Sequence, residues 1–131
     1  MQLNKSFWLN QFPALLYAGF IFVLSSIPGD TFPVVKLDLI SPDKLVHAML
    51  FGGLAFLLAH ALYHQESFPY LKENWLVCTI LFATLYAISD ETHQYFVRNR
   101  TPEIMDLNAD LFGIVVFSLI FLKFRTKALS K

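Results

Sequence analysis

Residues 75–97, WLVCTILFATLYAISDETHQYFV, decide the fold of this chain. The segment begins as an unbroken apolar run, and it has about the 20 residues that a helix needs to cross roughly 30 Å of hydrocarbon. Before the run ends, it carries two adjacent carboxylates, Asp90 and Glu91, with Gln94 close behind. Charges inside a membrane helix are costly unless the protein provides a partner or a water-filled pocket. The segment therefore predicts a membrane helix with one polar end.

Three further apolar segments of similar length predict three more membrane helices. The composition agrees, because 56% of the 131 residues are hydrophobic and only 15% are charged, against roughly 25% in soluble domains. The runs do not alternate like barrel strands, and only helices or closed barrels satisfy the backbone in lipid. We expect an all-α membrane protein, a single domain over residues 1–131 built as a four-transmembrane-helix bundle with short loops. The expected spans are about 7–27, 44–63, 75–97 and 104–124.

Two similar motifs precede the second and fourth expected spans, SPD at 41–43 and TPE at 101–103. Serine and threonine are good N-cap residues, and proline fits the first helical position, which needs no hydrogen-bond donor. The acid that follows favours the positive end of the helix dipole. We therefore expect Ser41 and Thr101 to cap these two helices.

The basic residues indicate the orientation of the bundle. With four spans, both termini lie on the same side of the membrane, and cytoplasmic segments carry an excess of Lys and Arg. The side with the termini would hold Lys5, Lys72, Lys123, Arg125, Lys127 and Lys131. The other side would hold Lys36, Lys44, Arg98 and Arg100. The bias predicts that both termini are cytoplasmic.

Polar residues of three spans fall at one end of the predicted bundle. They lie at the start of the second span, the end of the third and the start of the fourth, which short loops place in the same leaflet, the outer one in this orientation. Residues i and i+4 share a helix face, as do Asp43 with His47 and Asp106 with Asp110. We therefore expect a polar pocket between these spans. Its expected binding residues are Asp43, Lys44, Gln94, Arg100, Asp106 and Asp110, and its candidate acid–base residues are His47, Asp90 and Glu91.

Two stretches resemble the VanZ-like family of small bacterial membrane proteins. They are DKLVHAMLFGGLA at 43–55 and YAISDETHQYFVRNRTPEIMDLNADLFG at 86–113, and SSIPG at 25–29 is similar to the family's first loop. One departure is Asp110, where the family usually has Asn. The founding member is linked to resistance to the glycopeptide antibiotic teicoplanin. The resemblance therefore implies a multi-pass protein of the bacterial plasma membrane, close to the cell envelope, and it does not imply a reaction.

The predicted pocket is compatible with several kinds of function. In a catalytic interpretation, Asp90 or Glu91 is a general base, His47 shares the proton, and Arg100 holds an anionic headgroup. In a second interpretation, the pocket binds or transports an envelope lipid, a lipid-linked precursor or an amphiphilic glycopeptide without reaction. In a third, the bundle is a structural partner of another membrane protein. No known catalytic motif decides whether the protein is an enzyme.

The charge balance and the residue types present limit the classes of molecule that this protein is expected to bind. A net charge of zero argues against nucleic acid, and the single cysteine, Cys78, excludes an internal disulfide. His47 with Asp90, Glu91 and Asp110 offers nitrogen and oxygen ligands suited to zinc or manganese. The usual local spacing of metal ligands is absent, so we expect no metal and no cofactor. The expected partners are membrane lipid, an envelope precursor or an amphiphilic small molecule, and an oligomer is compatible with the sequence.

Overall fold

The computed structural model describes residues 5–31 and 42–129, and all regular secondary structure in these two ranges is helical. The long helices are α2 (Phe12–Ser25), α3 (Pro42–His64), α5 (Trp75–Gln94) and α6 (Ile104–Leu129). The short helices are α1 (Lys5–Asn10), the single-turn η1 (Gly29–Thr31) and α4 (Pro69–Glu73). The prediction of an all-α fold is confirmed.

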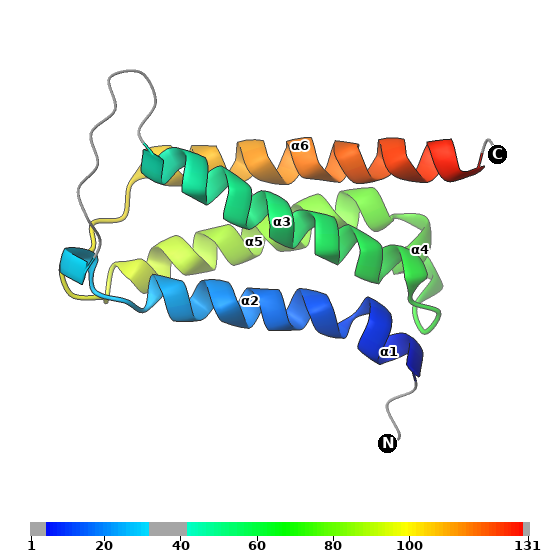
Figure 1. Ribbon diagram of the computed structural model, residues 1–131, viewed down its shortest axis with the longest axis horizontal. Coiled ribbons are helices and arrows are strands. Elements are labelled where there is room, and N and C mark those ends of the chain that lie inside the picture. The colour runs from blue at the N-terminus through cyan, green and yellow to red at the C-terminus, as the bar shows by residue number, and fades with distance from the viewer. Residues whose placement is uncertain (1–4, 32–41, 130–131) are drawn as a thin grey trace.

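The four long helices run roughly along the long axis of the molecule, and α3 and α5 lie between α2 and α6 in Figure 1. Helix α3 packs most extensively against α6, and both also contact α5. The start of α3, the end of α5 and the start of α6 lie together at one end of the bundle, beside η1. We call this the polar end. Helix α1 and the end of α6 lie at the opposite end.

Glycine allows a close approach of two long helices where α6 crosses α3. A Cβ atom on Gly113 would lie 2.0 Å from the carbonyl oxygen of Ala48, so a side chain does not fit there. A Cβ atom on Gly52 would meet the ring of Phe117 at 2.5 Å. Small residues at such crossings let membrane helices pack backbone to backbone. The crossing brings the first turns of α3 and α6 together.

The predicted spans correspond to the long helices, but their ends differ. The first span, 7–27, is divided, because α1 ends at Asn10 and α2 begins at Phe12. Pro13 explains this interruption, since its nitrogen has no hydrogen to donate to the preceding turn. The third span was expected to reach Val97, but α5 ends at Gln94 and turns follow.

The predicted cap at Thr101 is wrong. Helix α6 begins at Ile104, and the carbonyl oxygen of Glu103 accepts from the backbone N–H groups of Asp106 at 2.9 Å and Leu107 at 3.4 Å. Residues 101–103 therefore form the connection that leads into the helix. The predicted cap at Ser41 lies outside the described residues.

Among the described residues, two helices, α3 and α6, are long and apolar enough to cross a membrane. Helix α2 is apolar but has only 14 residues, and α5 has 20 residues with a polar last turn. Large apolar side chains are nevertheless exposed on all four long helices. Examples are Leu16 on α2, Met49 on α3, Val77 on α5 and Phe112 on α6.

Candidate functional site

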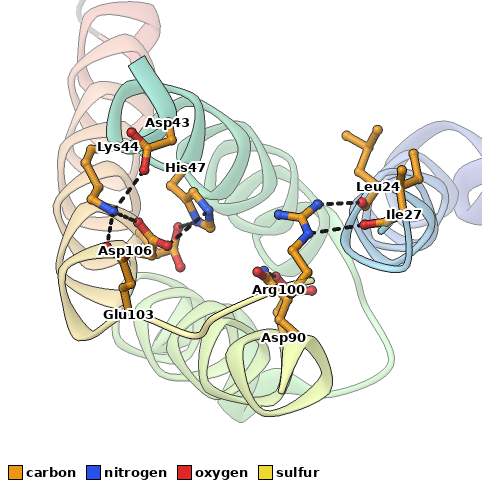
Figure 2. A network of polar contacts seen from close by, with 11 residues as sticks. Leu24, Ile27, Asp43, Lys44, His47, Asp90, Arg100, Glu103 and Asp106 are labelled. Carbon is orange, nitrogen blue, oxygen red and sulfur yellow. Dashed lines mark hydrogen bonds and ion pairs between the residues drawn. The ribbon is translucent and has the colours of Figure 1, made fainter. Parts of the chain in front are cut away.

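Lys44, on the first turn of α3, joins three carboxylates at the polar end. Its Nζ lies 2.9 Å from Oδ2 of Asp43 and 2.8 Å from Oε2 of Glu103, and it also contacts Oδ1 of Asp106 (Figure 2). The side chains of Asp43 and Glu103 are more than half exposed, so these two pairs add little stability. Asp106 is nearly buried. The Lys44–Asp106 pair therefore ties the start of α3 to the start of α6.

His47 lies one turn deeper on α3 and has an acid at each ring nitrogen. Its Nδ1 is 2.9 Å from Oδ1 of Asp110, whose side chain is completely buried. Its Nε2 is 3.8 Å from Oδ2 of Asp106, too far for a hydrogen bond. The contact at Nδ1 orients the ring and leaves Nε2 free to take a proton or a ligand. Asp43 and His47, which were expected to share a helix face, both line the same cavity, and the ion-pair partner of Asp43 is Lys44.

The two adjacent acids of α5 have different surroundings. Both are buried, as is Gln94 one turn later. Asp90 accepts a hydrogen bond of 2.9 Å from Nε2 of Gln94. Both carboxylate oxygens of Glu91 are buried, and neither has a hydrogen-bond partner among the described residues. The backbone N–H of Glu103 faces Glu91 without completing a hydrogen bond to it.

Arg100 connects the loop after α5 to the end of α2. Its Nε donates to the carbonyl oxygen of Ile27 and its Nη2 to that of Leu24, both at 3.2 Å (Figure 2). Carbonyl groups at the end of a helix lack partners within the helix, and the guanidinium fork suits them. Arg100 was predicted to hold an anionic group, and in the structure these two donors hold backbone instead. Arg98 is largely exposed and lies 3.9 Å from Asp30.

A cavity of about 640 Å³ lies at the polar end, within the usual range for small-molecule sites. One wall is apolar and comes partly from α2, which the sequence did not place at the site. It includes Ile21, Leu24, Val46, Leu50 and Phe51. The predicted site residues that line the cavity are Asp43, His47, Asp90, Gln94, Arg100 and Asp106. The other three, Lys44, Glu91 and Asp110, are outside its lining.

Several polar residues at this end were missed as site residues, among them Ser25, Asn99 and Thr101 of the cavity lining. Glu103 contacts Lys44 and lines the cavity. Nε2 of His93 is 3.0 Å from the hydroxyl oxygen of Ser26, and the imidazole ring stacks on the ring of Phe22. The acid of the TPE motif could have been identified as a site residue, since the expected short loops place Glu103 at the same end of the bundle as Lys44. The contribution of α2 has no such signal, because it consists of apolar side chains, backbone carbonyl groups and the small hydroxyl side chain of Ser25.

The fold and the site define a class: a helical protein with membrane-type helices and a polar cluster beside a cavity at one end of the bundle. The sequence model of the VanZ/LLP1 family matches residues 8–125. The chain belongs to this family, and the predicted resemblance is confirmed. Comparison with curated proteins and with solved structures gave no match.

Proposed function

We propose that the protein is a multi-pass protein of the bacterial plasma membrane whose cavity binds the headgroup of an amphiphile. The exposed apolar side chains on α2, α3, α5 and α6 support four crossings, because each long helix offers a surface suited to lipid. The excess of Lys and Arg at the opposite end supports an orientation with α1 and the end of α6 at the cytoplasm. The polar end then faces the cell envelope.

The cavity carries this proposal. It combines an apolar wall, including Leu24 of α2 and Leu50 of α3, with polar groups from α3, α5, α6 and the loop before α6. The two parts of an amphiphile match these two kinds of wall. Its acyl chain would lie beside the apolar side chains, and its headgroup would lie beside the polar groups. Carboxylates such as Asp90 and Asp106 accept hydrogen bonds from hydroxyl and amide groups. The ligand class is therefore an envelope lipid or lipid-linked precursor with a sugar or peptide headgroup, or an amphiphilic glycopeptide of the teicoplanin type.

Blocking the cavity tests the proposal. Val46 lines it, and Val46→Trp adds a large ring at its wall. The matched control is Val77→Trp on α5, a similarly exposed valine that is absent from the lining. Mass spectrometry of the purified proteins should detect a co-purified amphiphile with the wild type and with Val77→Trp, and much less of it with Val46→Trp. Equal ligand content in all three proteins, or none in any, would contradict binding in this cavity.

A further inference from the structure

Three potential metal ligands from three different helices converge beside the cavity. They are His47 on α3, Glu91 on α5 and Asp106 on α6, and one ligand atom from each lies within 4.8 Å of the other two. Nitrogen and oxygen ligands lie about 2.0–2.2 Å from a zinc ion, so ligands on the same ion are about 3–4 Å apart. The 3.8 Å between Nε2 of His47 and Oδ2 of Asp106 already matches this spacing. Glu91 needs only a small side-chain adjustment to complete the set.

The surroundings of Glu91 are an independent observation that points to a cation ligand. Its relative exposure is 9%, and neither carboxylate oxygen has a hydrogen-bond partner among the described residues. Burial of a carboxylate without a partner is strongly unfavourable, and buried polar groups in proteins are rarely left unsatisfied. The carboxylate of its neighbour Asp90 is satisfied in the usual way, because it accepts a hydrogen bond from Gln94. A cation between Glu91, His47 and Asp106 would satisfy the remaining carboxylate.

Contacts with neighbouring side chains orient the other two proposed ligands, His47 and Asp106. Asp110 holds Nδ1 of His47 at 2.9 Å, so that Nε2 is the nitrogen directed at Asp106. A carboxylate that contacts the second nitrogen of a histidine is the usual support of a histidine ligand in metal sites. Lys44 contacts Oδ1 of Asp106, which leaves Oδ2 directed at His47. The site therefore has an orienting partner behind each of these two ligands.

The charges at the polar end also favour a cation. Arg98, which also lies at this end, is largely exposed, and its nearest carboxylate is that of Asp30. Among the other charged groups that the structure describes at this end, the carboxylates outnumber the permanently positive side chains, Lys44 and Arg100. The acids are Asp43, Asp90, Glu91, Glu103, Asp106 and Asp110. Lys44 contacts only the outer three of these acids, and Glu91 and Asp110 lie deeper. A divalent ion at this depth would offset the excess negative charge where it is least exposed to water.

We propose that His47, Glu91 and Asp106 bind a divalent transition-metal ion, of the Mn²⁺ or Zn²⁺ type, at the inner side of the cavity. One imidazole and two carboxylates match the preferences of these ions. His47 and Asp106 line the cavity, which provides the path of entry. This departs from the expectation of no metal and from the ligand set considered in the sequence. Asp90 is bound to Gln94, Asp110 holds Nδ1 of His47, and Asp106 takes the ligand position.

Metal titration of the detergent-purified protein tests the site. After treatment with EDTA, Mn²⁺ binding is followed by electron paramagnetic resonance and Zn²⁺ binding by calorimetry. We expect one ion per chain and a higher melting temperature with metal. Glu91→Gln and His47→Ala should each weaken binding at least about tenfold, whereas Asp110→Asn should weaken it about 10–100-fold through the orientation of His47. Asp30→Asn, at an exposed carboxylate of the same end that lies outside the cavity lining, and His64→Ala are the matched controls, and both should bind as the wild type does.

The variant Glu91→Gln also separates metal binding from a purely structural role. Without metal, it removes a buried carboxylate that lacks a partner, so its melting temperature should equal or exceed that of the wild type. With metal, the increase seen for the wild type should be absent. Wild-type binding of neither ion, or unchanged affinity in both Glu91→Gln and His47→Ala, would overturn the site. Because no lipid is added, this test does not depend on the amphiphile proposed above.

Discussion

At the residue scale, Gly113 controls how closely α3 and α6 approach each other. Gly113→Ala places a methyl group 2.0 Å from the carbonyl oxygen of Ala48, and a backbone atom cannot rotate away. We expect a loss of about 1–3 kcal/mol in the free energy of unfolding, as for other overpacked sites. A melting curve in detergent measures this loss as a lower melting temperature.

Gly19 on α2 is the matched control for Gly113. A Cβ atom there would meet nothing within 4 Å, and alanine is the better helix former by roughly 0.5–1 kcal/mol. Gly19→Ala should therefore leave the melting temperature unchanged or raise it slightly. Equal losses for both variants would show that the α3–α6 crossing is not closely packed.

The two acids of α5 show how far single residues could be predicted. The cost of a charge inside a membrane helix predicted that Asp90 and Glu91 face the protein, and both are buried. The sequence could not predict which of the two carboxylates accepts a hydrogen bond from a neighbouring side chain. Gln94 reaches Asp90 because the two residues are four positions apart on one helix. The surroundings of Glu91 depend on α3 and α6, and their positions are a matter of helix packing.

At the scale of elements, Arg100 joins the loop between α5 and α6 to the end of α2. Arg100→Ala leaves the carbonyl groups of Leu24 and Ile27 without these two hydrogen bonds. We expect a destabilisation of about 1–3 kcal/mol, because the part-buried carbonyl of Ile27 loses this donor, while that of Leu24 keeps the backbone N–H of Ile27 at 3.2 Å. Chemical denaturation in detergent measures it as a lower midpoint.

Arg98 provides the control for Arg100, since it has the same side chain on the same loop. It is largely exposed and its contact with Asp30 is long, at 3.9 Å. Arg98→Ala should change the free energy of unfolding by less than about 0.5 kcal/mol. If both substitutions changed the midpoint equally, the loss of one positive charge at the polar end would explain the effect. The hydrogen bonds from Arg100 to α2 would then not be its cause.

The helix ends were predicted less well than the helices. Length and apolarity located the four segments, because these follow from the composition of each segment alone. The ends depend on local backbone bonds. Pro13 interrupts the first segment, and Glu103 supplies the first carbonyl acceptor of α6 in place of the expected Thr101.

At the scale of the whole molecule, the proposed orientation can be tested by labelling single cysteines. Arg98→Cys lies at the polar end and Phe68→Cys between α3 and α4, and both positions are largely exposed. The buried Cys78 is replaced by alanine in both proteins. A membrane-impermeant maleimide added to intact cells should label position 98 and leave position 68 unlabelled. Labelling of position 68 alone would reverse the orientation, and labelling of both would contradict four crossings.

The sequence by itself determined the helical class, the family and the end of the bundle at which the polar residues gather. Each of these follows from local composition, spacing or motif, which do not depend on how the helices pack. Only the tertiary structure decided that α2 supplies a wall of the cavity, that Arg100 holds backbone carbonyl groups, and that Glu91 meets His47 and Asp106. These features depend on the angles and distances at which helices cross. Close packing at positions such as Gly113 sets those angles, and no single segment encodes them.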